Sequence, residues 1–372
     1  MAELLSVATA LPEHCVSASE TKRHLAAMLP AGAASRYTRM VDGGGNQTRY
    51  AVLPPDQLRR QCSLEARNQA YRHHAVRLGE AVAREALERA ALAPDQVSAI
   101  IGVSSTGYLM PTLETYLFER LQLSPSCRRV PLTQLGCAGG AAGLALAAEL
   151  CDAAASARVL VVSVELPSVS FPAAEPSPTD IVAAMQFGDG AAAAVVSGGA
   201  SARGPQVLAT GSVVFPGTID RDGVHLTADG LRLMRPRGLA DILRHRLGDA
   251  VDQLLARCGL ARGDIGFWAI HPRNPDLIDA AAAGLALPDA ALTPSRAVWR
   301  RTGNLISAAL FHVLRELQTA APPADGAPGM MIAFGAGFGC EMVLLRSAGW
   351  LSGAAAHAAP LGRPVVSEAG PA

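Results

Sequence analysis

The sequence predicts an α/β fold built from two similar halves. Short apolar runs rich in Val, Ile and Ala alternate with longer runs rich in Ala and Leu, as expected for strands that alternate with helices. The second half of the chain repeats this rhythm. With 372 residues, the chain is long enough for two domains, or for one large duplicated domain with a sizeable core.

The first half begins with an apolar run that meets Pro12 early and has no basic segment before it. We therefore expect a first strand here and not a signal peptide. Pro111 is expected in the first turn of a helix, where its missing N–H costs nothing. The other expected strands of this half lie at 98–105, 128–132, 157–166 and 191–198, and the expected helices at 111–123 and 138–155.

The second half is expected to start after a Gly-, Ser- and Pro-rich stretch near 199–205. This stretch suggests an N-terminal half at 1–203 and a C-terminal half at 204–351. Residues 352–372 have a biased composition without periodicity, so we expect a poorly ordered tail. The expected strands lie at 205–215, 266–272, 329–337 and 340–347, and the expected helices at 239–259 and 304–317.

Composition excludes several classes of function. Half of the residues are hydrophobic and 17% are charged, which suits a compact globular protein. Lys plus Arg equals Asp plus Glu at 32 each, so nucleic-acid binding has no global electrostatic support. No uncharged apolar run reaches about 18 residues, so no membrane span is expected. The seven cysteines contain no CxxC pair, which argues against a zinc site and leaves a reducing cytoplasm as the expected location.

Cys137 is the first candidate for chemistry. It lies between a short expected strand and an expected helix, and Gly136, Gly139 and Gly140 surround it. A sulfur at a helix N-terminus is favoured as thiolate by the helix dipole and by unpaired N–H groups. A lone cysteine is more often an inert core residue. The glycine-rich context favours a functional thiol instead.

His271 and Asn304 also lie at the ends of expected elements. His271 ends a strand, and Asn304 follows Gly303 at the start of a helix. Taken singly, a core or surface histidine and a helix N-cap are the simpler interpretations. Together with Cys137 they form a set that suits a condensing enzyme. The thiolate would hold an acyl group, and the histidine and the amide would donate hydrogen bonds to an enolate oxygen. The histidine could also pair with the cysteine and lower its pKa.

Four segments resemble motifs of the type III polyketide synthases, the chalcone synthase superfamily. They are QLGCAGGAAGL, MQFGDGAAA, AIHPRNPDLID and TGNLISAA, and the resemblance runs over roughly residues 3–350. It implies a thiolase-like fold, duplicated and layered αβαβα, in a homodimer. It also implies that Cys137, His271 and Asn304 are the catalytic residues.

The resemblance further implies a mechanism and its substrates. Cys137 would take a starter from an acyl-CoA, and His271 and Asn304 would stabilise the enolate formed as malonyl-CoA loses carbon dioxide. The cycle would repeat before cyclisation, with no cofactor or metal beyond the CoA substrates. Ser170 and Leu233 are compatible with a long aliphatic starter and an alkylpyrone or alkylresorcinol product. An aromatic or short starter stays open, as do the number of extensions and the mode of cyclisation.

Further positions take roles only through the resemblance. Phe187 would orient malonyl-CoA, although it could equally be a core residue. Arg36 and Arg39 would contact CoA phosphates, for which arginine is physically suited. Met110 would reach across the dimer interface into the cavity of the partner.

The chain departs from the family at several places. Arg273 and Asn274 replace two glycines near the expected CoA opening. Leu233 stands where plant enzymes carry a gatekeeper phenylalanine, and Val224 stands near a position that is small in plant enzymes. In the segment AFGAG, Ala333 and Ala336 replace Gly and Pro. The pocket is therefore not expected to match that of a plant chalcone synthase.

Three alternatives stay open at this point. A ketoacyl-ACP synthase III shares the fold and the Cys–His–Asn set, but usually shows His–Gln–Ala–Asn where this chain has HPRNP. A degradative thiolase would need a second catalytic cysteine, for which Cys340 is a candidate by position; its setting in a strand instead suggests a core residue. A non-catalytic dimeric scaffold or acyl-binding partner would not need all three polar residues.

Overall fold

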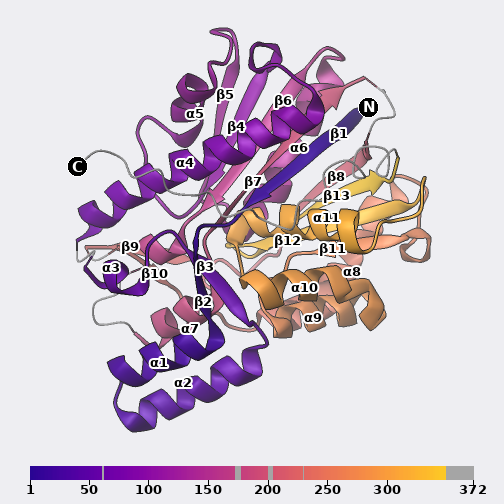
Figure 1. The fold of residues 1–372 in the computed structure, drawn as a ribbon. Helices are drawn as coiled ribbons and strands as arrows, with labels where there is room; N and C mark the ends of the chain where they lie inside the picture. The colour runs from indigo at the N-terminus through magenta and orange to yellow at the C-terminus, as the bar shows by residue number, and fades with distance from the viewer. Residues whose placement is uncertain (61–62, 172–176, 200–203, 229, 349–372) are drawn as a thin grey trace.

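The structure, a computed structural model, describes residues 1–60, 63–171, 177–199, 204–228 and 230–348 (Figure 1). The expected tail at 352–372 and most of the expected boundary near 199–205 lie outside the described residues. The central feature is a sheet of nine strands in the order β11-β12-β13-β8-β1-β7-β6-β4-β5.

The strands of the first half form one side of this sheet. Strand β1 pairs antiparallel with β7, which pairs antiparallel with β6. Strands β6, β4 and β5 run parallel to one another. The bounds are β1 (Ala2–Ala10), β4 (Ala99–Ser104), β5 (Arg128–Thr133), β6 (Arg158–Glu165) and β7 (Gly190–Gly198).

The strands of the second half repeat this order and these directions. Strand β8 pairs antiparallel with β13, β13 pairs antiparallel with β12, and β12 runs parallel to β11. The two halves meet where Ala2 and Glu3 pair with Val207 and Gln206. The repeat confirms the predicted duplication. The bounds are β8 (Gln206–Val214), β11 (Phe267–Ile270), β12 (Pro328–Gly335) and β13 (Gly339–Arg346).

Helices form three layers around the two halves of the sheet (Figure 1). Helices α6 (Gly139–Ala153) and α11 (Ala309–Ala320) occupy the centre and contact strands of both halves. Helices α4 (Leu64–Ala90) and α5 (Leu113–Leu121) cover the outer face of the first half. Helices α8, α9 and α10 cover the second half. Their bounds are α8 (Leu239–Ala256), α9 (Pro275–Leu285) and α10 (Thr293–Thr302). The chain therefore has the predicted αβαβα layers.

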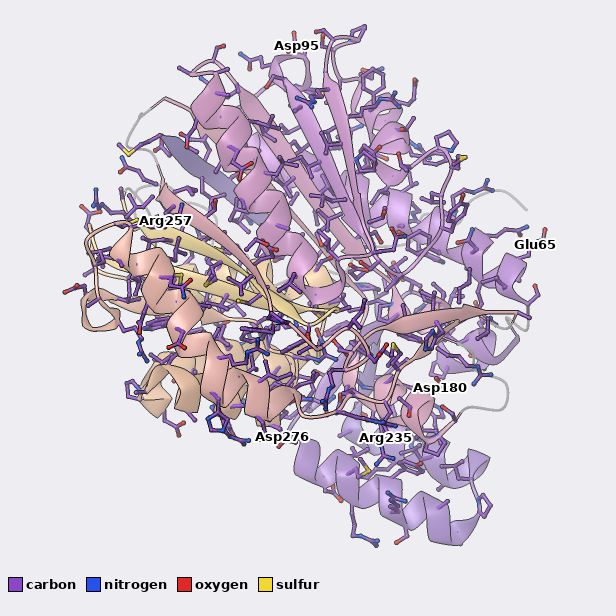
Figure 2. All side chains as sticks on the ribbon, turned by 180° about the vertical axis from the view of Figure 1, so that it is seen from behind. Glu65, Asp95, Asp180, Arg235, Arg257 and Asp276 are labelled. Carbon is purple, nitrogen blue, oxygen red and sulfur yellow. The ribbon has the colours of Figure 1, made fainter. Side chains whose placement is uncertain are left out.

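The hydrophobic cores follow these layers. One buried cluster joins the central helices to the inner faces of both sheet halves. Two further clusters fill the spaces below the outer helices. Charged side chains such as Asp95, Arg257 and Asp276 lie exposed around both halves (Figure 2). None of the helices in the described part of the chain has the length and hydrophobicity that a membrane span needs.

A smaller group of elements extends from one end of the layers. It was not predicted from the sequence, because its elements are short or have few apolar positions. Helices α1, α2 and α7 pack on one another through Leu25, Tyr37, Val41, Ile181 and Met185. The bounds are β2 (His14–Ser17), α1 (Ala18–Met28), α2 (Ala31–Gly44), β3 (Thr48–Ala51), α3 (Pro55–Arg60), α7 (Pro178–Gln186), β9 (Val224–Thr227) and β10 (Gly230–Leu233).

Two predicted helix starts were wrong. Helix α5 begins at Leu113 with Thr112 as its N-cap, so Pro111 lies before the helix and not in its first turn. Helix α11 begins at Ala309, after a short 3₁₀ turn at Ile306–Ala308. Asn304 is therefore not the N-cap of this helix, and its side chain is available for other contacts.

Candidate active site

Cys137 lies in a 3₁₀ turn, Gly136–Ala138, that leads directly into α6. The chain enters this turn with Gly136 at a φ of +55°, a region that glycine adopts without steric cost. The thiol is 7% exposed and lies at the N-terminus of α6, as predicted. Sequence alone placed this residue correctly because the flanking glycines mark the turn.

Helix α6 approaches the second half closely at Gly140. A Cβ atom at this position would clash with the carbonyl oxygen of Ser307, which belongs to the turn before α11. Only glycine allows this approach. The contact brings the turn that carries Cys137 against the turn that follows Asn304, so the two halves meet at the candidate site.

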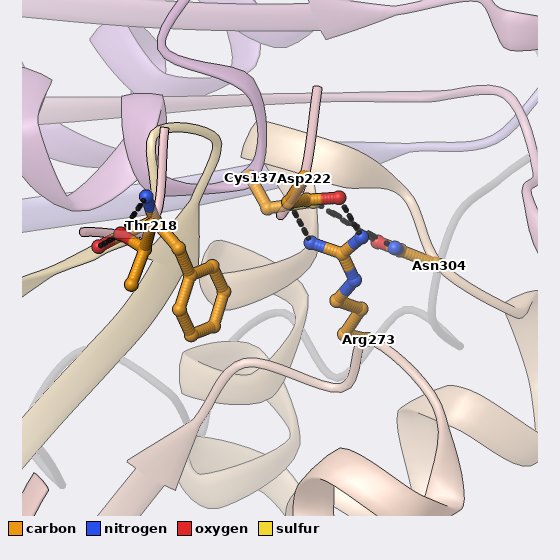
Figure 3. A network of polar contacts seen from close by, with 6 residues as sticks. Cys137, Thr218, Asp222, Arg273 and Asn304 are labelled. Atoms are coloured by element: carbon orange, nitrogen blue, oxygen red, sulfur yellow. Dashed lines mark hydrogen bonds and ion pairs between the residues drawn. The ribbon is translucent and has the colours of Figure 1, made fainter. Parts of the chain in front are cut away.

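Asn304 is held between α7 and the turn before α11. Its N–H donates to the carbonyl of Gln186 at 2.8 Å, and its carbonyl accepts from Gly188 N–H at 3.0 Å. The side-chain Oδ1 accepts from the N–H of Ile306 at 2.8 Å. Nδ2 lies 3.7 Å from Sγ of Cys137. Figure 3 shows the two residues side by side. The structure thus brings together the two predicted residues that are 167 positions apart.

His271 follows β11 and is fully buried. Its N–H donates to the carbonyl of Ile332 at 2.9 Å, but neither ring nitrogen has a hydrogen-bond partner among the described residues. Burial lowers the pKa of the imidazole to about 3, and the charge of Arg273 acts in the same direction. The structure thus contains no contact between this ring and Cys137 that would correspond to the expected ion pair. A neutral ring still offers one N–H donor to a substrate oxygen.

The environment of Cys137 contains an ion pair that the sequence did not predict. Arg273 donates to both carboxylate oxygens of Asp222 at 2.6 Å each, and both side chains are buried (Figure 3). Burial raises the pKa of Cys137 to about 11, while the nearby charge of Arg273 and the hydrogen bond with Asn304 act in the opposite direction.

Two adjoining cavities meet at this site. The larger has a volume of about 870 Å³ and is lined by Cys137. The smaller has a volume of about 370 Å³ and is lined by Asn304. Three residues line both cavities and so mark the junction between them: Phe187, Leu233 and Arg273. An elongated substrate could therefore extend through both cavities past the thiol.

The remaining predicted residues divide into two groups. Ser170, Val224 and Leu233 line the larger cavity. Phe187, at the C-terminal end of α7, faces the junction with its ring 5.7 Å from that of Phe171. The structure does not bring Met110, Arg36 or Arg39 into either cavity, and all three are exposed.

Arg273 and Asn274 stand where the family has two glycines. Arg273 is buried inside the site and does not stand at its opening. Asn274 lies beside the smaller cavity and caps α9, its Oδ1 accepting from Leu277 N–H at 2.9 Å. Cys340 lies in strand β13 within the core of the second half, where burial raises its thiol pKa to about 12. It is a core residue, as predicted.

Glu165 was missed by the sequence analysis. It ends β6, is fully buried and accepts hydrogen bonds from Thr106 Oγ1 at 2.8 Å, Ser105 N–H at 3.0 Å and the Ser307 hydroxyl. Ser105 in turn accepts from the N–H of Gly136 at 2.9 Å. Burial raises the pKa of Glu165 to about 7. A charged residue at the end of an apolar strand was the signal that could have revealed it.

Comparison with known proteins agrees with this arrangement. Residues 1–200 match the N-terminal domain of the chalcone and stilbene synthases, and residues 207–349 match the C-terminal domain of the same family. The chain is 34% identical over 347 residues to a 1,3,6,8-tetrahydroxynaphthalene synthase of Streptomyces peucetius subsp. caesius, with 92% of each chain covered. It is 31% identical over 353 residues to the enzyme of that name from Streptomyces griseus, again with 92% of each chain covered.

A solved structure shows the same fold. The crystal structure of 1,3,6,8-tetrahydroxynaphthalene synthase from Streptomyces coelicolor A3(2), a bacterial type III polyketide synthase, superposes with a TM-score of 0.88 at 28% identity. The match covers 93% of this chain and 99% of that chain. The chain therefore belongs to the chalcone and stilbene synthase family of type III polyketide synthases.

Proposed function

We propose that this chain condenses malonyl-CoA onto an acyl group held as a thioester on Cys137. The observation that carries the proposal is the meeting of Cys137 and Asn304 at the junction of two cavities. His271 lies two residues before Arg273, which lines both cavities, and its buried ring nitrogens have no partner among the described residues. The ketoacyl-ACP synthase alternative is disfavoured, because both halves match the chalcone and stilbene synthases.

The proposed chemistry has three stages. Sγ of Cys137 attacks the carbonyl carbon of an acyl-CoA, the S–C bond to Cys137 forms, and CoA leaves as the thiol. Malonyl-CoA then loses carbon dioxide, and the electron pair of the broken C–C bond forms an enolate. The N–H donors of His271 and Asn304 stabilise the enolate oxygen. The enolate carbon attacks the thioester and releases the Cys137 sulfur for the next cycle.

The smaller cavity is proposed to receive the CoA arm. It opens beside Asn274 and Asp276 and leads to Phe187 at the junction. Arg36 and Arg39 are proposed phosphate contacts, because they are exposed on α2, which packs against the helix that leads to Phe187. No cofactor or metal beyond the CoA substrates is required by this chemistry.

The lining of the larger cavity indicates which kind of starter acyl group it could hold. Its lining is mostly apolar, with Leu64, Tyr71, Val169, Leu226 and Leu231 among its residues. Such a lining stabilises an aliphatic chain by removing it from water. We therefore propose an aliphatic acyl-CoA starter and an alkylpyrone or alkylresorcinol product. The Streptomyces relatives favour a second candidate, a tetrahydroxynaphthalene product.

We also propose that the chain works as a homodimer in the cytoplasm. Met110 is 81% exposed, and Tyr108, which lines the larger cavity, is 67% exposed. Such exposure of neighbouring large apolar side chains is typical of an interaction surface. A second copy of the chain would cover them. A free catalytic thiol suits a reducing compartment.

The proposal is tested with the purified protein, malonyl-CoA and a panel of acyl-CoA starters of increasing length. Mass spectrometry should show an acyl adduct on the peptide that contains Cys137, and Cys137→Ala should remove both adduct and product. Turnover that survives Cys137→Ala would contradict the assignment. An aliphatic product identifies the first candidate, and a tetrahydroxynaphthalene formed from malonyl-CoA alone identifies the second.

A further inference from the structure

We infer that Arg273 is a positioning residue that supplies the fixed positive charge of the Cys137 site, and that Asp222 holds Arg273 in place and moderates its charge. The inference deepens the proposed function, since it concerns the reactivity of the proposed nucleophile. The sequence led us to expect that a charged His271 would favour the Cys137 thiolate. We assign this effect to the guanidinium of Arg273 instead.

The first step is the direction of the Arg273 side chain. Strand β11 ends at Ile270, and two residues after His271 the N–H of Arg273 donates back to the carbonyl of His271 at 2.9 Å. This tight turn points Arg273 into the site, where it lines the same cavity as Cys137. Arg273 is 8% exposed, so solvent screens its charge only weakly.

The second step is the anchoring of Asp222. Thr218 earlier in the same loop donates to the carbonyl of Phe215 and accepts from Phe338 N–H at 2.8 Å (Figure 3). On the other side, Gly223 accepts from Met234 N–H at 2.9 Å. The chain is thus held by hydrogen bonds both before and after Asp222. Its bidentate contact fixes the guanidinium in turn, because the planar fork of arginine matches a carboxylate.

The third step is the balance of charges around the sulfur. The charged groups that act on Cys137 are Arg273, Asp222 and Glu165, and only Arg273 favours the thiolate. His271 is neutral and offers no charge. Among the charged side chains around the sulfur, Arg273 is thus the one that favours ionisation, and Asp222 opposes it.

This arrangement gives a test in which two variants that break the same ion pair act in opposite directions. Arg273→Gln removes the favourable charge and leaves Asp222, so Cys137 should ionise less readily. Asp222→Asn removes the opposing charge and leaves Arg273, so Cys137 should ionise more readily. A purely structural role of the pair would instead shift both variants in the same direction.

The measurement is the rate at which iodoacetamide alkylates Cys137, followed by mass spectrometry of its peptide over a range of pH. In this reaction the S–C bond forms, iodide leaves and the thiol proton passes to water. Because one pKa unit corresponds to a tenfold change in thiolate, we expect Arg273→Gln to slow the reaction by about tenfold or more below the thiol pKa. Asp222→Asn should accelerate it.

Four further variants make the test specific. The double variant R273Q/D222N should fall between the single variants, and Arg273→Lys should retain most of the rate because it keeps the charge. Arg262 and Asp252 form a similar bidentate pair away from both cavities, at 2.7 and 2.9 Å, so R262Q and D252N should leave the rate unchanged.

The inference is overturned if R273Q and D222N change the rate in the same direction, or if neither changes it in protein whose melting transition shows that it is folded. The readout needs neither substrate nor turnover. If acyl transfer failed while the opposite shifts were observed, the proposed function would be wrong and the inference would stand.

Discussion

At the scale of single residues, the candidate site combines side chains whose charge states are set by burial. His271 has no hydrogen-bond partner on either ring nitrogen within the described chain, and burial together with Arg273 lowers its pKa to about 3. Its neutral ring can donate to a substrate oxygen without a prior protonation step. Asn304, 3.7 Å from the Cys137 sulfur, provides a second donor that does not titrate.

We predict that His271 does not titrate between about pH 5 and about pH 9, whereas an ordinary histidine changes charge within this range. The imidazole signals can be followed by nitrogen-15 NMR, and the His271→Gln variant identifies the signal of this residue. An imidazolium signal from His271 near neutral pH would contradict the charge state that the structure indicates.

The sequence predicted part of this site. Cys137 and His271 were placed correctly because each follows a recognisable strand, and the glycines around Cys137 indicate a turn. Asp222 and Arg273 could not be paired in advance, because they are 51 positions apart and no periodic pattern connects them. The neutral state of His271 depends on burial and on Arg273, and both follow from tertiary packing alone.

At the scale of elements, the approach of α6 to the turn before α11 determines how the two halves meet. Gly140 allows this approach, since any side chain would collide with the Ser307 carbonyl. The predicted helices at 138–155 and 304–317 were correct in type, but the start of the second was placed too early. The 3₁₀ turn at Ile306–Ala308 is stabilised by contacts across the halves, which a local pattern does not reveal.

We predict that Gly140→Ala lowers the free energy of unfolding by about 1–3 kcal/mol or more, as expected when a methyl group is forced into a packed region. Gly32 in α2 is the matched control, because a Cβ there has no atom within 4 Å. Gly32→Ala should be neutral or slightly stabilising. Denaturant unfolding of both variants measures the difference, and equal midpoints would show that the close approach does not constrain the fold.

At the scale of the whole molecule, the predicted duplication and αβαβα layering are observed, because strand–helix alternation is a strong signal over a long chain. The group formed by α1, α2 and α7 was not predicted, since its buried residues come from separate short segments. The long helix α4 was also missed. Its buried positions include Arg67, Gly79 and four alanines, which weakens the apolar pattern.

Global stability should depend on the protonation of Glu165. Its pKa rises from 4.5 to about 7 on burial, so the folded protein holds this proton more tightly than the unfolded chain. The resulting stability is fully present below the unfolded pKa and is lost as the pH rises through about 7. We predict that Glu165→Gln removes this loss, which is on the order of 3 kcal/mol.

The measurement is the free energy of unfolding of both proteins in urea at a series of pH values. Glu88 is exposed on α4, and Glu88→Gln serves as the control that removes a carboxylate without affecting a buried one. If Glu165→Gln and the parent protein showed the same dependence on pH, the carboxylate would not carry a proton in the folded state.

The junction between the halves has a consequence for how the chain must be assembled. Cys137 belongs to one repeat and Asn304 to the other, each before one of the two central helices, and His271 and Arg273 follow β11 in the second repeat. Neither repeat alone holds all the residues of the proposed reaction centre. Separate repeats would have to find each other at every encounter, whereas a covalent link raises their effective concentration to about the millimolar range. The single polypeptide thus makes the encounter of the proposed nucleophile and its proposed donors an intramolecular event.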